Sequence, residues 1–259
     1  MKIKNILAAS AIALVSVSSA NAVLTYTAGD VLLGFRTSTK DLVIDLGSYT
    51  NFTPSNTNVL VAHLASDLVA LDASWTTNTA LSWGAIGYAN PGASNGLIFV
   101  SKGETTPGTP VTGWTQTTKS NTTAIYNNIS SYTNTGFTSQ TSNTTVANGL
   151  ITTPSSTTSQ DWNNYVTGSI TGYSGISFGK FSSTIEANAT GGSVITSTAL
   201  DLFKMTANGS GAAPLQGTFT LTSGGDVYFN AVPEPSTYAM IGFGGLGLLG
   251  MLRRRSIKA

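Results

Sequence analysis

The sequence predicts a mostly β protein, an antiparallel β-sandwich-like domain with one short helix that lies between two targeting ends. Three observations favour this class: short apolar stretches recur between turn-forming residues, one stretch alternates strictly between apolar and polar residues, and only one stretch has helical spacing. Of the 259 residues, 40 are Thr, 31 are Ser and only 9% are charged, so hydroxyl groups rather than ions wet the surface. This composition is typical of a secreted protein.

Three pairs of apolar stretches, each separated by a turn-forming segment, predict three antiparallel hairpins. The last pair is the clearest, because residues 217–222 alternate strictly before a turn at 223–226 and a second stretch at 227–229. The other two pairs are residues 29–36 with 41–47, joined by a polar turn at 37–40, and residues 81–88 with 96–100, around Asn90-Pro91-Gly92.

Between the first two hairpins, the leucines Leu60, Leu64, Leu68 and Leu71 have the spacing of one helix face, which predicts a short helix. Residues 104–165 differ from the rest, because Thr, Ser and Asn dominate and apolar residues are thinly spaced. Such a segment buries little apolar area against the entropy of ordering it. We expect long loops or weak strands there.

Composition excludes several classes of function. The chain has no Cys, which excludes disulfides, thiolate metal sites and a cysteine nucleophile. Residues 23–232 hold six basic and ten acidic side chains, a net charge of −4. Without a basic stripe, the contacts to phosphate that dominate nucleic-acid affinity have no source. We therefore expect no nucleic-acid partner.

The N-terminus has the pattern of a secretory signal peptide. Two lysines precede an apolar run at residues 6–17, and Ala20-Asn21-Ala22 follows as an A-x-A site for signal peptidase. The run of about a dozen residues is shorter than the roughly 20 that a membrane-spanning helix needs. We expect residues 1–22 to be removed after Ala22, so that the exported domain, residues 23–231, starts at Val23.

The C-terminus, residues 232–259, begins with a Pro-Glu-Pro segment. Pro233 and Pro235 fix φ and favour extended backbone in the residues that precede them, including Glu234. Extended backbone is the form that a processing enzyme can bind in its active site. The segment is therefore a candidate recognition motif.

An apolar segment and an arginine cluster follow. Residues 238–252 hold no charge and would span only about 22 Å as a helix, which suits a transient rather than a permanent transmembrane anchor. Arg253, Arg254 and Arg255 should stay on the cytoplasmic side under the positive-inside rule. This retention places the domain on the outside.

This tail resembles the PEP-CTERM sorting signal of Gram-negative bacteria that produce extracellular polysaccharide. The resemblance implies that a membrane enzyme, exosortase, cuts at Pro233, Glu234 and Pro235 and passes the protein to the cell surface. The alternative is an ordinary single-pass anchor with a Pro-rich stem.

The exported domain also resembles a group of PEP-CTERM proteins with a "GDLLLGFR"-type start. The matching segments are Gly-Asp-Val-Leu-Leu-Gly-Phe-Arg at 29–36, Val-Ile-Asp-Leu-Gly at 43–47, Leu-Ser-Trp-Gly at 81–84 and Leu-Asp-Leu-Phe-Lys at 200–204. This resemblance supports sorting and implies no particular chemical activity.

Candidate catalytic and metal-binding residues are few. His63 is the only histidine, falls on the predicted helix and has no Gly-x-Ser-x-Gly segment to accompany it, so we expect a solvated or hydrogen-bonded structural residue. One His, no Cys and no EF-hand pattern give no basis for a metal site, and no cofactor is expected.

Carboxylate pairs could hydrolyse a glycosidic bond, and Asp41 with Asp45 and Asp67 with Asp72 are examples. No recognised catalytic motif surrounds these residues. We therefore expect a protein that is not an enzyme.

The four tryptophans bear on sugar binding, because indole rings stack on sugars. Trp83 lies between Leu81 and Ile86 in a predicted strand, which favours the core. Trp114 and Trp162 have polar neighbours in the sequence, so we expect them to be exposed and to be the candidates for carbohydrate stacking.

The sequence thus predicts an exported cell-surface or extracellular-matrix protein, with exopolysaccharide or a biofilm as its setting. Its predicted partners are signal peptidase, an exosortase-type enzyme, the membrane before processing, and exopolysaccharide. The alternative is a secreted carbohydrate-binding or carbohydrate-cleaving module, which would need an exposed Trp beside a shallow groove.

Overall fold

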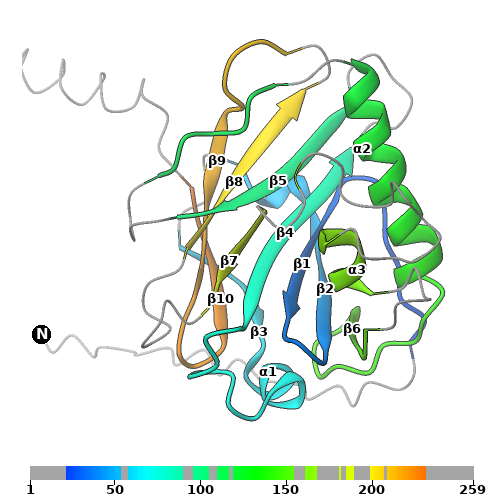
Figure 1. Ribbon diagram of the computed structural model, residues 1–259, viewed down its shortest axis with the longest axis vertical. Helices are drawn as coiled ribbons and strands as arrows, with labels where there is room; N and C mark the ends of the chain where they lie inside the picture. The colour runs from blue at the N-terminus through cyan, green and yellow to red at the C-terminus, as the bar shows by residue number, and fades with distance from the viewer. Residues whose placement is uncertain are drawn as a thin grey trace, which may run out of the picture.

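A computed structural model describes residues 22–53, 58–89, 96–104, 110–116, 119–154, 161–167, 181, 185–189, 199–206 and 209–231. Within these residues, ten strands form one antiparallel sheet with a few helices (Figure 1). The strands are β1 (Asp30–Arg36), β2 (Asp41–Ser48), β3 (Val59–His63), β4 (Ser82–Ala89), β5 (Leu97–Gly103), β6 (Gly149–Thr152), β7 (Glu186–Asn188), β8 (Ala199–Thr206), β9 (Leu215–Leu221) and β10 (Asp226–Ala231). The helices are α1 (Ala65–Leu71), α2 (Lys119–Ser131) and α3 (Trp162–Thr167), with a 3-10 turn at Tyr49–Asn51 and a π-helical segment at Tyr132–Phe137 that continues α2.

The three predicted hairpins are confirmed as β1–β2, β4–β5 and β9–β10. The strands follow the order β3-β10-β9-β8-β5-β4-β1-β2-β6, and β7 pairs with β4 beside this path. The mostly β, antiparallel class is confirmed. The sandwich is replaced by a single sheet that curls, so that side chains of β2 and β10, near opposite ends of the order, meet in one cluster.

The inner core lies inside this curl. It takes alternate side chains from the strands, such as Leu33 and Phe35 of β1, and Phe219 and Phe229 near the other end of the sheet. Phe52, just after the 3-10 turn, packs edge-on against both of the latter rings. Trp83 is part of this core, as predicted.

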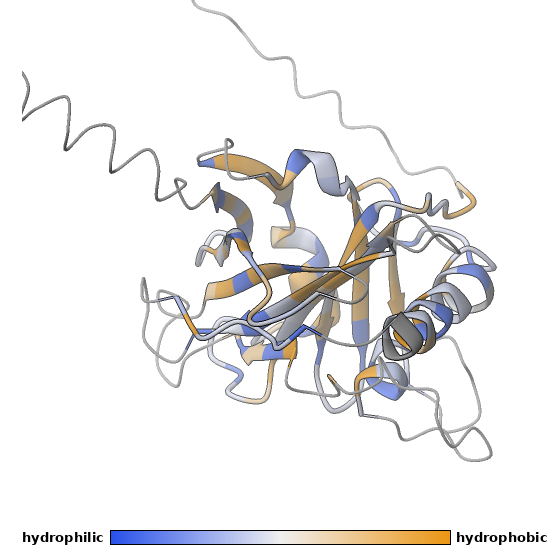
Figure 2. Ribbon diagram, turned by 90° about the horizontal axis from the view of Figure 1, so that it is seen from above, coloured by the Kyte–Doolittle hydropathy of each residue, from blue (hydrophilic) through white to orange (hydrophobic). Residues whose placement is uncertain are grey.

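The outer core lies on the other face of β1, β2, β4, β5 and β8, under the helices. Leu32 and Ile86 of the strands meet Ile129 of α2 and Tyr165 of α3 there. Figure 2 shows most of the hydrophobic colour on the strands, whereas α2, which lies beside the sheet, is largely pale or blue. The prediction of loops or weak strands for residues 104–165 is therefore wrong at α2 and α3. A few well-spaced apolar residues, Ile125, Ile129, Tyr132 and Phe137, are enough to bind a mostly polar helical run to an apolar sheet face.

The predicted leucine helix is shorter than expected. Leu64, Leu68 and Leu71 are buried around α1, but Leu60 lies on β3 and is exposed. His63 likewise ends β3 rather than lying on the helix. Pairing with β10 overrides the helical spacing at this point, because the spacing covers too few residues to stabilise a helix by itself.

The strands at the two ends of the sheet, β6 and β3, differ in what lies along their outer edges. Strand β6 carries the side chain of Asn143 on its outer side, where the Asn143 amide donates to the Ile151 carbonyl at 2.8 Å and accepts from the Ile151 N–H at 2.7 Å. This amide imitates a neighbouring strand. Strand β3, at the other end, pairs with β10 and exposes Val59 and Leu60.

The predicted signal peptide up to Asn21 and the predicted tail from Val232 onward lie outside the described residues, as do Ala20 and the Pro-Glu-Pro and Arg residues. Ala22 and Val23 are described, and Val23 pairs with Thr141, beside which Leu24 enters the outer core. No helix among the described residues is both long enough and apolar enough to span a bilayer.

Candidate functional site

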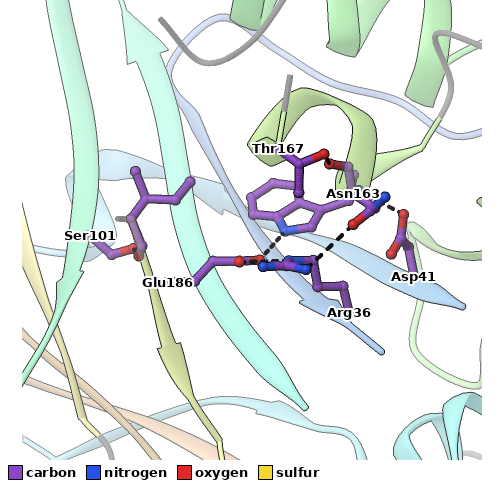
Figure 3. A network of polar contacts seen from close by, with 8 residues as sticks. Arg36, Asp41, Ser101, Asn163, Thr167 and Glu186 are labelled. Atoms are coloured by element: carbon purple, nitrogen blue, oxygen red, sulfur yellow. Dashed lines mark hydrogen bonds and ion pairs between the residues drawn. The ribbon is translucent and has the colours of Figure 1, made fainter. Parts of the chain in front are cut away.

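A buried polar network lies where β1, β7 and α3 meet (Figure 3). The Glu186 carboxylate of β7 accepts from Arg36 Nε at 2.6 Å and from Trp162 Nε1 at 3.0 Å, so both of its oxygens are bound. The Glu186 side chain is almost fully buried, and the Arg36 side chain is partly exposed. The Glu186 carboxylate is buried and bound through both oxygens to donors from β1 and α3, and these charge-assisted hydrogen bonds hold β1, β7 and α3 in one geometry.

The network continues into the first turn of α3. The Asn163 side chain accepts from Arg36 Nη1 at 3.4 Å, and the Asn163 backbone N–H donates to Asp41 Oδ2 at 2.7 Å. The second oxygen, Asp41 Oδ1, has no hydrogen-bond partner within the described part of the chain, and the residue is fully buried.

Burial changes the acidity of these groups. Desolvation raises the pKa of Asp41 to about 7, against the lowering effect of the Asn163 N–H, and the negative charges of Asp161 and Glu186 raise it further. Desolvation also raises the pKa of Glu186, although Arg36 and Trp162 oppose this rise. Near neutral pH, Asp41 is therefore divided between its neutral and charged forms.

Gly34 explains why α3 can lie so close to the sheet. A Cβ atom on Gly34 would lie 2.1 Å from the Trp162 ring, so only glycine lets the indole lie flat on β1. Trp162 is consequently buried, and the prediction that it is exposed for carbohydrate stacking is wrong. Its neighbours Asp161 and Asn164 are buried as well, so the polar residues beside Trp162 in the sequence do not indicate exposure. The indole ring fills the space over Gly34.

Trp114, the other stacking candidate, is half-buried. The ammonium group of Lys102 lies 5.2 Å from the centre of its ring, and Phe181 packs against it with a centroid distance of 4.9 Å. Its Nε1 donates to the Ser101 carbonyl at 3.1 Å. The structure does not bring Trp114 and Trp162 onto a common exposed face, because Trp162 has none.

The fold separates the carboxylates of one pair considered for glycoside hydrolysis and hydrogen-bonds those of the other pair to backbone N–H groups. Asp41 and Asp45 lie four residues apart on β2, which is about 13 Å along a strand, beyond the roughly 5–9.5 Å between catalytic carboxylates. Asp67, in α1, instead accepts from the Thr145 N–H at 2.6 Å and the Val146 N–H at 3.2 Å. Asp72 accepts from the Ser74 N–H at 2.8 Å.

His63 is exposed and forms a hydrogen-bonded pair with Asp226, at the start of β10. The prediction of a solvated, hydrogen-bonded histidine is confirmed, although its element is a strand. Among the described residues, no group of three or more His, Asp or Glu side chains is placed to hold a metal ion.

Sequence reasoning missed Glu186, Asn163 and Ser101. The Ser101 hydroxyl accepts from the Ala85 N–H at 2.7 Å and donates to the Ile185 carbonyl at 2.6 Å, where β4 and β5 separate and β7 begins. One signal was available for Arg36, because a charge that ends a continuous apolar run needs a partner. Nothing in the sequence indicated that the partner would be Glu186, 150 residues away.

Comparison with known families gives one match. Residues 231–255 match the PEP-CTERM protein-sorting motif. The predicted resemblance of the tail is thereby confirmed, and the motif implies an exported protein with an exosortase-type processing partner. No curated protein and no solved structure matches the chain. The resemblance of residues 29–36 to a group of exported domains stays a prediction.

Proposed function

We propose that the chain is a non-catalytic protein of the cell surface or extracellular matrix, delivered there by signal peptidase and an exosortase-type enzyme. The observation that supports this proposal is the sorting motif at residues 231–255, which begins at the last residue of β10, the last strand among the described residues. The domain is thus followed directly by its sorting signal.

In this proposal, signal peptidase cuts before Val23, and residues 238–252 then hold the protein in the membrane with Arg253, Arg254 and Arg255 on the cytoplasmic side. The burial of Leu24 supports a mature chain that starts close to Val23, because this residue already belongs to the domain. Exopolysaccharide is the proposed surrounding of the displayed domain, on the strength of the sorting pathway.

The polar network supports the non-catalytic part of the proposal. Both Glu186 oxygens are bound to Arg36 and Trp162, and Asp41 is fully buried, so these groups connect elements of the fold. The burial of Trp162, one of the two residues expected to stack on sugars, disfavours the carbohydrate-binding alternative.

Two variants of the tail separate recognition from retention. Changing Pro233, Glu234 and Pro235 to Ala removes the extended, acidic segment, so the protein should stay uncut in the membrane. Changing the three arginines to Gln should instead weaken retention on the cytoplasmic side and yield incorrectly sorted protein.

The measurement is export in a host with an active exosortase, followed by membrane fractionation and mass mapping of both termini. The released wild-type protein should begin at Val23. Trimming and display of the Pro-Glu-Pro variant at the wild-type level would contradict the proposal and leave a plain membrane-anchored protein.

A further inference from the structure

The sorting motif and the folded sheet share a residue. Ala231 is the first residue of the motif match and the last residue of β10, where it is buried and pairs with Gly217 of β9. Pro233 follows two residues later, and two residues of fully extended chain reach at most about 7 Å. An enzyme that holds the Pro-Glu-Pro segment therefore also lies against the end of β10.

The strand beside that end is β3. It runs antiparallel to β10, with Val59 opposite Phe229 and Leu60 opposite Tyr228. Just before it, the Asn58 N–H donates to the Asn230 side chain at 3.1 Å, one residue before the motif. The beginning of β3 therefore lies beside the point at which the chain enters the sorting motif.

This neighbouring surface, residues 58–60, is uncharged and partly apolar. Four large apolar side chains are exposed among the described residues, and two of them are Val59, at 38%, and Leu60, at 53%. No charged residue occurs from 46 to 62. Val59 and Leu60 thus expose apolar side chains on both faces of one strand, directly beside the segment that the processing enzyme must bind.

We propose that residues 58–60, which we call the β3 surface, form a docking surface for the exosortase-type processing enzyme. The complementary part of that enzyme is an uncharged apolar segment that lies along the edge of β3. This inference rests on the proposed function, because it identifies a second contact in the same processing step.

The geometry favours a protein partner over the lipid surface. Successive residues of a strand point to opposite faces of the sheet, so a flat bilayer would contact Val59 or Leu60 but not both. An extended protein segment that adds to the strand edge contacts both of them. Binding at two points, the motif and the β3 surface, raises the effective concentration of the enzyme at the cut site.

A matched pair of variants tests the docking surface. The double variant Val59→Thr, Leu60→Thr places β-branched residues at both strand positions and removes apolar surface. The control is Val69→Thr in α1, because Val69 is also 53% exposed but lies beyond the opposite end of β3. In a pulse-chase of the full chain with an active exosortase, the double variant should be processed about tenfold more slowly, and the control at the wild-type rate.

A linker excludes a folding artefact. Twelve Gly and Ser residues inserted after Ala231 allow the enzyme to bind the motif away from the sheet. In this background, the double variant should slow processing less than twofold. An equal slowing with and without the linker would overturn the docking proposal, because a folding defect would act in both backgrounds.

A photo-crosslinking amino acid at position 60 identifies what lies on the β3 surface. The expected product is an adduct with the enzyme, and position 69 should give none. Lipid adducts alone would overturn the proposal in favour of the bilayer. Wild-type processing of the double variant, together with a block by the Pro-Glu-Pro alanine variant, would refute docking and leave the proposed function intact.

Discussion

The two halves of the curled sheet are built by different sequence patterns. In the helix-covered half, β1 and β4 are buried on both faces and read as nearly continuous apolar runs. In the open half, β9 and β10 alternate between buried and half-exposed residues, because only the inner face meets a core. A continuous run therefore indicates a second layer, and strict alternation indicates its absence.

The largest expected effect is the loss of the Trp162 ring from the covered half. Trp162→Ala removes a fully buried indole and one partner of Glu186, so we expect the free energy of unfolding to fall by about 3–5 kcal/mol. Chemical denaturation of the exported domain measures it. Thr220→Ala, on the outward face of β9, is the control and should stay within about 0.5 kcal/mol of wild type. Equal losses in both variants would abolish the distinction between the halves.

The next effect concerns the space between the layers. Gly34→Ala should cost about 1–3 kcal/mol, because its Cβ would overlap the Trp162 ring. In the Trp162→Phe background, the same substitution should cost less, since a smaller ring leaves room. If the losses in the free energy of unfolding are additive in this double-mutant cycle, the Trp162 ring and position 34 are not in steric contact, and the explanation is wrong.

A smaller effect should appear in the pH dependence. The folded-state pKa of Asp41 is raised to about 7 by desolvation, above its unfolded value near 4, so the folded state binds more protons between these values. The stabilisation is full below about pH 4 and is lost as pH rises through 7. Asp41→Asn should reduce the fall in stability between pH 5 and 8 by an amount of the order of 2–3 kcal/mol.

Burial also raises the pKa of Asp45 to about 7, with a contribution from the nearby Asp30, so part of the slope should remain in the Asp41 variant. Denaturation curves at several pH values measure the slope. An unchanged slope in Asp41→Asn would contradict the assignment.

The smallest effect compares the two ends of the sheet. Asn143→Ala removes two hydrogen bonds to Ile151 and opens the edge of β6, so stability should fall by about 1 kcal/mol. Self-association, measured by light scattering, should rise, because an open edge pairs with other chains. A monomeric variant would show that the amide does not protect this edge.

How much the sequence could predict follows from the same contrast. Hairpins depend on neighbouring residues and turn chemistry, so all three could be predicted. The helices that cover the sheet could not be predicted in this way. Ile125 and Ile129 are isolated apolar residues in the sequence, and they stabilise a helix only by packing on an apolar sheet face formed elsewhere in the chain. The continuous apolar runs of β1 and β4 do indicate that a second layer packs on the outer face of these strands.

The candidate site shows a similar division. The sorting motif consists of consecutive residues, so it could be recognised directly. The network of Arg36, Asp41 and Glu186 joins distant segments, and the exposure of Trp162 was misjudged because the space over Gly34 exists only after β1 and α3 meet. The β3 surface was not predicted, because the spacing of Leu60 from Leu64 and Leu68 indicated a helix face rather than a strand.

The pairing of Ala231 with Gly217 has a consequence for where the chain can be cut. A protease binds its substrate as free, extended backbone, and a paired strand must open before it can be cut. Extracting residues upstream of Val232 would pull Ala231 and Phe229 out of the inner core. The folded domain therefore sets an upstream limit: the first bond that a protease can reach without opening the sheet lies after Ala231.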